Sequence, residues 1–84
     1  MNESKRDYLF YFGNHIQNLR NAQKLSLRQL AQRCDVDFSE ISKIEKGERN
    51  IQITTIVELA KGLGKQPKEL FDFSFEIKED DKRK

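Results

Sequence analysis

The chain has 84 residues, 36% of them charged, and carries a formal net charge of +2. Its length predicts one small domain, and a single Cys with a single His leaves no internal disulfide and no ligand set for a metal site. No apolar run approaches the roughly 18 residues of a membrane span, and the first residues carry charge where a signal peptide is apolar, so we expect a cytoplasmic protein.

Apolar residues at helical spacing predict a first helix that ends near Gln23. Its buried stripe would consist of Leu9, Phe12, Ile16 and Leu19. Residues 1–8 are expected to form an arm ahead of this helix. Gly13 lies inside it, where glycine costs roughly 1 kcal/mol relative to alanine, so the sequence favours the helix less strongly at this position.

A short second helix is predicted from four apolar residues at helical spacing, Leu27, Leu30, Ala31 and Cys34. Ser26 before it and Gln29 three residues later form a capping box, in which each side chain accepts the other residue's backbone N–H. Leu25 and Leu30 occupy the staple positions on either side of that cap. Three local signals therefore agree on where this helix begins.

A turn at residues 35–37 separates this helix from a third one that has the same start signals. Asp37 is the cap, Glu40 stands at the third helical position of a capping box, and apolar residues flank the cap as a staple. Gly47 is placed to end the helix in a left-handed conformation. Two residues are expected to face the core, Ile41 and Ile44.

A fourth helix is predicted from five apolar residues, Ile53, Ile56, Val57, Ala60 and Leu63. It should stop at the glycines around residues 62–64. Pro67 suits the first position of a short fifth helix. That helix would carry Leu70 and Phe71.

The period of the apolar residues changes from helical to alternating at the sequence FDFSFEI. Phe71, Phe73, Phe75 and Ile77 alternate with polar residues, which predicts a strand. This strand could close the core of the monomer or pair with its twin in a dimer, and the sequence favours neither. The chain is therefore divided into an arm at 1–8, a domain at 9–72, and a strand with a solvated, charged tail at 73–84.

Two short helices joined by a three-residue turn must meet at a steep angle, which is typical of a helix-turn-helix. In that motif the second helix enters the major groove of DNA. Four side chains of the third helix point away from the expected core: Phe38, Ser39, Ser42 and Lys43. Hydroxyls and a lysine can pair with base edges, and a phenyl ring can contact a thymine methyl. The alternative is an ordinary solvated helix surface.

Residues 12–71 resemble the Cro/repressor-like helix-turn-helix family, also called the XRE family. The resemblance rests on four stretches in the same order, FGNHIQNLRNAQKLSLRQLAQ, ISKIEKGERN, TTIVELAKGLG and PKELF. Arg49 and Asn50 followed by an apolar residue also resemble the controller proteins of restriction–modification systems. The resemblance implies an all-α, five-helix domain, here with a short C-terminal strand or tail, that binds a palindromic DNA operator as a homodimer and regulates transcription.

The resemblance also implies roles for individual residues. Phosphate contacts would come from the start of the second helix and the loop after the third, namely Leu27, Arg28, Gln29, Lys46, Arg49 and Asn50. For Lys46 and Arg49, which flank Gly47, the alternative is an ordinary solvated surface. The family often has Gln where this chain has Leu27, so only the backbone N–H could serve there. The turn usually has Gly at the position of Asp35, and Asp tolerates the left-handed conformation better than most residues.

Two further groups of residues are implied by the family. Arg20 and Glu45 would form a structural ion pair between the first and third helices, with a functional basic–acidic pair as the alternative. For the dimer interface the family points to the fifth helix and the turn before it, residues 65–71, and the alternating pattern of the predicted strand offers a further route. The expected interface residues are Pro67, Leu70, Phe71, Phe73 and Phe75.

An enzyme is not expected, because no nucleophile elbow, phosphate loop or pair of carboxylates frames the Ser, His and Asp residues. No cofactor is implied, and Cys34 is interpreted as a buried small hydrophobe rather than a redox sensor. The alternative function is a protein-interaction module, such as an antitoxin or a partner-binding regulator, with DNA binding secondary. The modest net charge and Glu40 on the predicted reading helix keep this alternative open.

Overall fold

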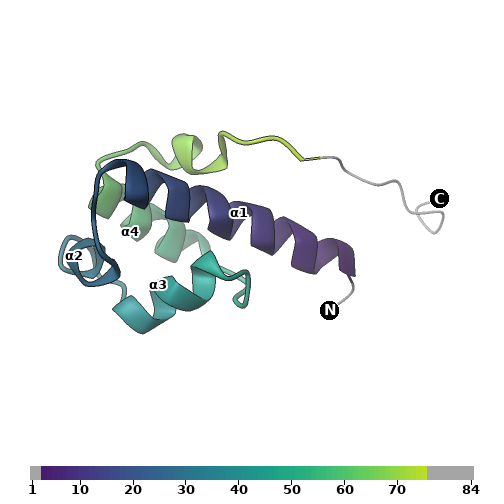
Figure 1. The fold of residues 1–84 in the computed structure, drawn as a ribbon, viewed down its shortest axis with the longest axis horizontal. Helices are drawn as coiled ribbons and strands as arrows, with labels where there is room; N and C mark the ends of the chain where they lie inside the picture. The colour runs from purple at the N-terminus through teal and green to yellow at the C-terminus, as the bar shows by residue number, and fades with distance from the viewer. Residues whose placement is uncertain (1–2, 76–84) are drawn as a thin grey trace.

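The computed structural model describes residues 3–75, which form four α-helices and a final 3-10 helix (Figure 1). The elements in chain order are α1 (Glu3–Ala22), α2 (Leu27–Ala31), α3 (Phe38–Glu45), α4 (Ile53–Leu63) and the 3-10 helix η1 (Pro67–Phe71). α1 is the longest helix, and both α3 and η1 pack against it. α2 contacts α3 and α4. The all-α prediction is confirmed for the described residues, with the fifth helix as a 3-10 turn.

α1 begins at Glu3, well before the expected start at Leu9, so residues 3–8 belong to a helix rather than to an arm. Gly13 allows α3 to cross α1 closely. A Cβ at Gly13 would stand 2.1 Å from the carbonyl oxygen of Ile44, a separation that no methyl group can occupy. The residue that weakens the helical propensity of α1 is therefore the one that permits its contact with α3.

The core is built from apolar side chains of every helix. Six of them are almost completely enclosed: Ile16, Leu30, Ile41, Ile44, Leu59 and Leu70. α4 has its predicted bounds and ends at Gly64, whose φ is +67°. Ile53 and Val57, two of the five apolar residues from which this helix was predicted, are 71% and 40% exposed and lie four residues apart on its outer face.

After a tight turn at Asp72, where the Phe73 backbone N–H donates to the carbonyl oxygen of Phe71 at 2.8 Å, residues 73–75 run along α1 without forming a strand (Figure 1). The strand prediction is therefore wrong for these residues, and Ile77 lies outside the described part of the chain. In an extended segment alternate side chains share a face whether or not another strand pairs with it. Phe73 and Phe75 are half-buried against α1, whereas Asp72 and Ser74 are exposed. The alternation of apolar and polar residues in the sequence therefore reflects packing of one side of this segment against α1.

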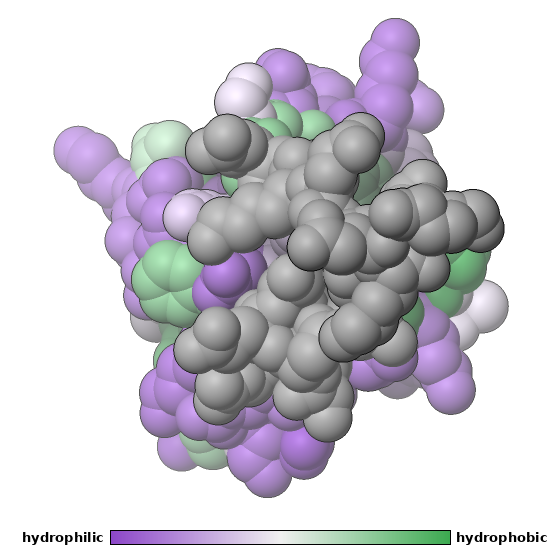
Figure 2. All heavy atoms as spheres, turned by 90° about the vertical axis from the view of Figure 1, so that its right-hand side faces the viewer, coloured by the Kyte–Doolittle hydropathy of each residue, from purple (hydrophilic) through white to green (hydrophobic). Residues whose placement is uncertain are grey.

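Figure 2 looks onto the right-hand end of the molecule as drawn in Figure 1, and most of the described surface visible there belongs to hydrophilic residues, with separate hydrophobic patches. None of the helices among residues 3–75 is long and apolar enough to cross a membrane. The large apolar side chains exposed in the described structure are Phe10, Tyr11, Phe38, Ile53, Val57 and Phe71.

Candidate nucleic-acid interface

The start of α2 is held by the predicted capping box. Ser26 Oγ accepts the backbone N–H of Gln29 at 3.0 Å, and Gln29 Oε1 accepts the backbone N–H of Ser26 at 2.7 Å. Leu25 and Leu30 are buried beside the cap, as the staple requires. The cap occupies the Gln29 side-chain oxygen, and the amide NH2 group of this side chain is the donor that could meet a phosphate.

α2 is shorter than its apolar pattern, because it ends at Ala31 rather than continuing to Cys34. The Cys34 Sγ–H donates to the carbonyl oxygen of Leu30 at 3.4 Å, and the side chain packs half-buried against the core. Burial raises the pKa of this thiol. A protonated thiol in apolar surroundings fits the interpretation of Cys34 as a small hydrophobe.

The turn between α2 and α3 is fixed by α4. Asp35 does not adopt the left-handed conformation expected of it, since the non-glycine residue with a positive φ in the described structure is Lys24. Instead, the Asp35 backbone N–H donates to Glu58 Oε1 at 2.9 Å. That hydrogen bond, followed by one from Lys61, lowers the pKa of the Glu58 carboxyl below its ordinary value of 4.5.

α3 begins at its predicted cap and ends at its predicted glycine. The Asp37 carboxylate accepts the backbone N–H of Ser39 at 3.3 Å and also the Ser39 hydroxyl proton. Gly47 has a φ of +77°, and a Cβ there would stand 2.8 Å from the Cα of Phe10. Both the backbone conformation and the neighbouring α1 therefore restrict this position to glycine.

The side of α3 that faces away from the core is polar. Successive residues of a helix are rotated by about 100°, which places the residues of this outer face opposite Ile41 and Ile44. Ser39, Lys43 and Lys46 are exposed on it, and Ser42 is half-buried at its edge. The structure therefore brings three of the four predicted base-reading residues together on one face.

Phe38, the fourth predicted base-reading residue, lies at the α2 edge of this face and is 36% exposed. The guanidinium carbon of Arg28 stands 4.3 Å from the centroid of its ring, which is a cation–π contact. A predicted phosphate-binding residue of α2 and a predicted base-reading residue of α3 are thus in direct contact.

Glu40 lies at the opposite edge of the same face, and its predicted role is wrong. It was expected to complete a capping box with Asp37, but its Oε1 accepts the Nε–H of Arg49 at 3.1 Å. The two side chains are 39% and 42% exposed. The sequence did not predict this pair, because the two residues are nine positions apart and come together only through the path of the chain after Gly47.

The remaining predicted phosphate-binding residues lie on α2, at the end of α3 and in the loop that follows. Lys46 is exposed at the C-terminal cap of α3, and Asn50 is exposed in the following loop. The side chain of Leu27 packs half-buried against the core, so its backbone N–H is the group that could meet a phosphate. Their contacts with DNA stay predictions.

Arg20 and Glu45 form the expected pair between α1 and α3. Arg20 Nε and Nη2 donate to the two carboxylate oxygens of Glu45 at 2.7 and 2.9 Å, and Nη1 donates to the carbonyl oxygen of Leu25 at 2.8 Å. Both residues are buried, at 9% and 7% exposure. The hydrogen bonds to Glu45 raise the pKa of the Arg20 guanidinium, against the lowering effect of its burial. This geometry is structural and leaves Arg20 no free edge for DNA.

The five residues predicted for the dimer interface have different environments. Leu70 has no exposed surface and belongs to the monomer core, so its assignment to the interface is corrected. Phe73 is half-buried, with its ring centroid 5.2 Å from that of His15 on α1. Phe75 is also half-buried and stacks on Tyr11 at 5.8 Å. Pro67 and Phe71 are exposed.

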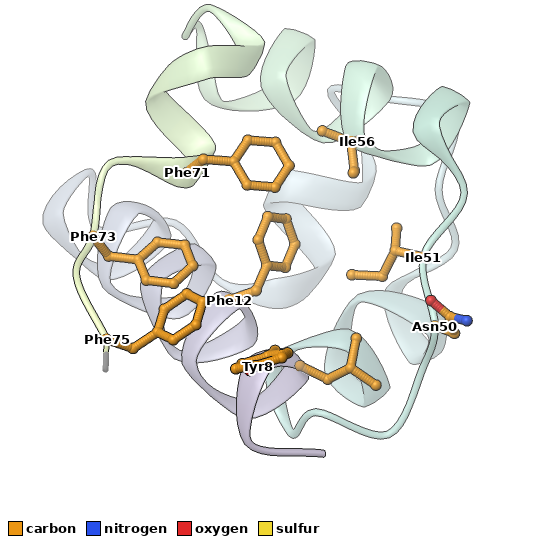
Figure 3. A pocket seen from close by; sticks show the side chains of 9 residues that line it. Tyr8, Phe12, Asn50, Ile51, Ile56, Phe71, Phe73 and Phe75 are labelled. Atoms are coloured by element: carbon orange, nitrogen blue, oxygen red, sulfur yellow. The ribbon is translucent and has the colours of Figure 1, made fainter. Parts of the chain in front are cut away.

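An apolar hollow of about 240 Å³ opens between α1, the loop before α4 and the C-terminal segment (Figure 3). Aromatic rings and Ile51 and Ile56 line it, and Asn50 lies at its rim (Figure 3). No group of three or more His, Cys, Asp or Glu side chains suited to a metal occurs among the described residues. The hollow therefore offers apolar contact rather than converging polar groups.

A helix-turn-helix family model matches residues 16–70 of the chain. Control protein C.BamHI of Bacillus amyloliquefaciens is 39% identical over 64 residues, which cover 75% of this chain and 79% of that protein. The crystal structure of the restriction-modification controller protein C.AhdI from Aeromonas hydrophila is 37% identical and superposes with a TM-score of 0.75, covering 77% of this chain and 98% of that one.

A further similar structure is that of the restriction-modification controller protein C.Esp1396I, solved as a tetramer in complex with its natural 35-base-pair operator. It is 26% identical and has a TM-score of 0.71, covering 76% of this chain and 84% of that one. Residues 16–70, which the helix-turn-helix family model matches, include α2, α3 and the loop that carries Arg49. This chain belongs to the helix-turn-helix family, among the restriction–modification controller proteins.

Proposed function

We propose that this protein is a transcriptional regulator that binds a specific double-stranded DNA sequence as a homodimer, with α3 in the major groove. The observation that carries the proposal is the two-sided character of α3. Its inner side buries Ile41 and Ile44, and its outer side exposes Ser39, Lys43 and Lys46. A helix anchored in this way can offer hydrogen-bonding side chains to base edges while the fold stays intact.

The four base-reading candidates would act through different chemistry. Lys43 can donate to the O6 and N7 atoms of guanine, and the Phe38 ring can contact a thymine methyl. Ser42 can donate or accept. Ser39 can only accept, because its hydroxyl proton is held by the Asp37 carboxylate. These constraints favour an operator half-site that contains G·C and A·T pairs in a defined order.

Phosphate contacts would flank the outer face of α3 on both sides. Arg28 lies at the α2 edge and Arg49 at the loop edge, while Lys46 is exposed at the end of α3. Cationic groups on two sides of a groove-binding helix fix its register on the duplex without reading sequence. The backbone N–H of Leu27, the Gln29 amide and Asn50 would complete the clamp.

A homodimer is proposed because two copies of α3 must stand about 34 Å apart to enter successive major grooves on one face of DNA. Ile53 and Val57 on α4, together with Phe71 on the adjacent η1, expose large apolar side chains on neighbouring elements. Exposed apolar side chains in this arrangement are typical of a contact between protein surfaces. We propose that these three residues, with Pro67, form the dimer contact.

The relative C.Esp1396I, solved as a tetramer with its operator, supports DNA binding by an oligomer here. The test is a selection of duplexes from a random pool with the full-length protein, followed by fluorescence anisotropy at several salt concentrations. We expect an enriched palindromic sequence that binds about 10³-fold or more tightly than its scrambled version. The logarithm of the affinity should fall linearly with the logarithm of salt concentration. Equal binding of both duplexes would contradict the proposal.

The second candidate function, a protein-interaction module, is favoured by one observation. Phe10 and Tyr11 are 53% and 44% exposed on α1, outside the helix-turn-helix elements α2 and α3. A selection that enriches no duplex, combined with an intact fold, would support that function instead. A cytoplasmic location stays a prediction under either function.

A further inference from the structure

We infer that Glu40 is a positioning residue for Arg49, holding its guanidinium so that the two Nη groups face a phosphate of the bound DNA. The inference rests on the proposed DNA-binding function and adds to it a determinant of affinity that contacts no DNA itself. A carboxylate beside a DNA-binding face is unexpected, because its charge repels the phosphate backbone. The geometry of this pair supplies a reason for it.

The hydrogen-bonding pattern of Arg49 is one-sided. Glu40 Oε1 accepts from Nε at 3.1 Å, and among the described residues neither Nη1 nor Nη2 has a hydrogen-bond partner. A guanidinium presents five N–H donors in a fixed planar fork, and the outer groups match the oxygens of a phosphate in a bidentate arrangement. The Arg49 side chain is 42% exposed, so those groups can be reached.

The two partners differ in how firmly they are held. Glu40 projects from α3, whose neighbouring residues Ile41 and Ile44 are buried. Arg49 lies in a stretch without regular structure at residues 48–50. A long side chain on such a loop loses rotamer freedom when it binds a ligand, and a partner that orders it beforehand reduces that loss. Glu40 therefore holds a fixed position on α3, and its hydrogen bond orients the guanidinium of Arg49.

The positioning role and the charge of Glu40 have opposite effects on DNA affinity. If Glu40 only repelled phosphates, removing it would strengthen binding. If Glu40 positions Arg49, removing its carboxylate should weaken binding, although a negative charge is lost. The sign of the change therefore separates the two roles, and the dependence of that sign on Arg49 identifies the mechanism.

The experiment measures operator affinity by anisotropy for the full chain and for Glu40→Ala, Glu40→Gln, Arg49→Ala and the Glu40→Ala/Arg49→Ala double variant. We expect Glu40→Ala to weaken binding by about two- to tenfold, the range for one long side chain that must be ordered on binding. Glu40→Gln should lose less, because the amide oxygen still accepts from Nε. In the Arg49→Ala background, Glu40→Ala should no longer weaken binding.

Glu48→Ala is the matched control, because it removes an exposed carboxylate from the same loop without touching Arg49. It should leave the affinity unchanged or raise it. Circular dichroism melts of each variant check the fold, and Arg49→Lys, which keeps the charge but has no Nε, should abolish the effect of Glu40→Ala in the same way.

If Glu40→Ala strengthens binding like Glu48→Ala, or weakens it equally with and without Arg49, the positioning role is overturned while the DNA-binding function stands. If the unaltered protein shows no selective, salt-sensitive binding to any duplex, the proposed function fails, and this inference fails with it.

Discussion

α3 carries the glutamates of two Arg–Glu pairs that share the same chemistry and differ in their surroundings. Arg20 and Glu45 are buried and bidentate, and every nitrogen of the guanidinium has an acceptor within the protein. Glu40 and Arg49 are about 40% exposed and joined by one hydrogen bond. A buried pair is satisfied internally and can only support the fold, whereas a half-exposed pair keeps donors for a ligand. Burial, rather than residue type, separates the structural pair from the pair for which we propose a role in DNA binding.

The largest expected effect comes from breaking the buried pair. Glu45→Ala should lower the free energy of unfolding by about 3–5 kcal/mol, because the Arg20 charge is left buried and uncompensated. Glu40→Ala is the control on the same helix and should cost about 1 kcal/mol or less. Urea denaturation followed by circular dichroism measures both.

A cycle with Arg20→Ala and the Arg20→Ala/Glu45→Ala double variant tests whether the loss comes from the pair. We expect the double variant to be destabilised by less than the sum of the single variants. Additive losses would show that the two side chains stabilise the fold independently. Arg20 and Glu45 would then not act as a buried structural pair.

The same contrast between packed and exposed side chains applies to the aromatic residues near the C-terminus. Phe73 packs on α1, so Phe73→Ala should lower the free energy of unfolding by about 1–2 kcal/mol, less than for a fully buried phenylalanine. Phe71 is 51% exposed, although its ring also packs 5.1 Å from that of Phe12, so Phe71→Ala should lower the free energy of unfolding by less than Phe73→Ala and should weaken the proposed dimer. Urea denaturation and sedimentation velocity separate the two. An unaltered dimer in Phe71→Ala would move the interface elsewhere.

The smallest effect should come from Glu58, which orders the turn through the Asp35 backbone N–H. Its pKa is lowered first by that hydrogen bond and then by Lys61. A carboxyl with a lowered folded-state pKa contributes stability above its unfolded value of 4.5 and loses it as pH falls through the folded value.

Glu58→Gln should therefore be less stable than the unaltered protein at pH 7, and the difference should shrink as pH falls below 4.5. Thermal melts of both proteins between pH 3 and pH 7, about the range in which a carboxyl titrates, measure it. A difference that stays constant with pH would show that ionisation of Glu58 does not contribute.

Local signals predicted much of the fold. The Ser26 and Asp37 caps and the terminal glycines Gly47 and Gly64 lie where their neighbours in sequence indicate, because each is defined by bonds within a few residues. The start of α1 was placed too late because aromatic residues crowd its apolar stripe. The role of Gly13 could not be predicted, since it depends on how closely α3 crosses α1.

The candidate site was predicted less completely, because its edges depend on contacts distant in sequence. Glu40 has the spacing of a capping residue, and only the path of the loop after Gly47 brings it to Arg49. The alternation of Phe71, Phe73 and Phe75 predicted a strand, but Phe71 ends the 3-10 helix η1, and a period of two does not say whether a strand or a helix lies beside the segment that follows. Tertiary packing decides both cases.

The proposal that α3 reads the bases is tested most directly by measuring the affinities of Lys43→Ala and Arg49→Ala for a panel of single-base variants of the selected operator. Lys43 is exposed on the outer face of α3, which we propose to read the bases, so its loss should change the preference at particular base pairs by about 1–3 kcal/mol and leave other positions unaffected. Arg49→Ala should weaken all sequences about equally and reduce the salt slope by about one unit. A uniform loss for Lys43→Ala would contradict the claim that the outer face of α3 reads the bases.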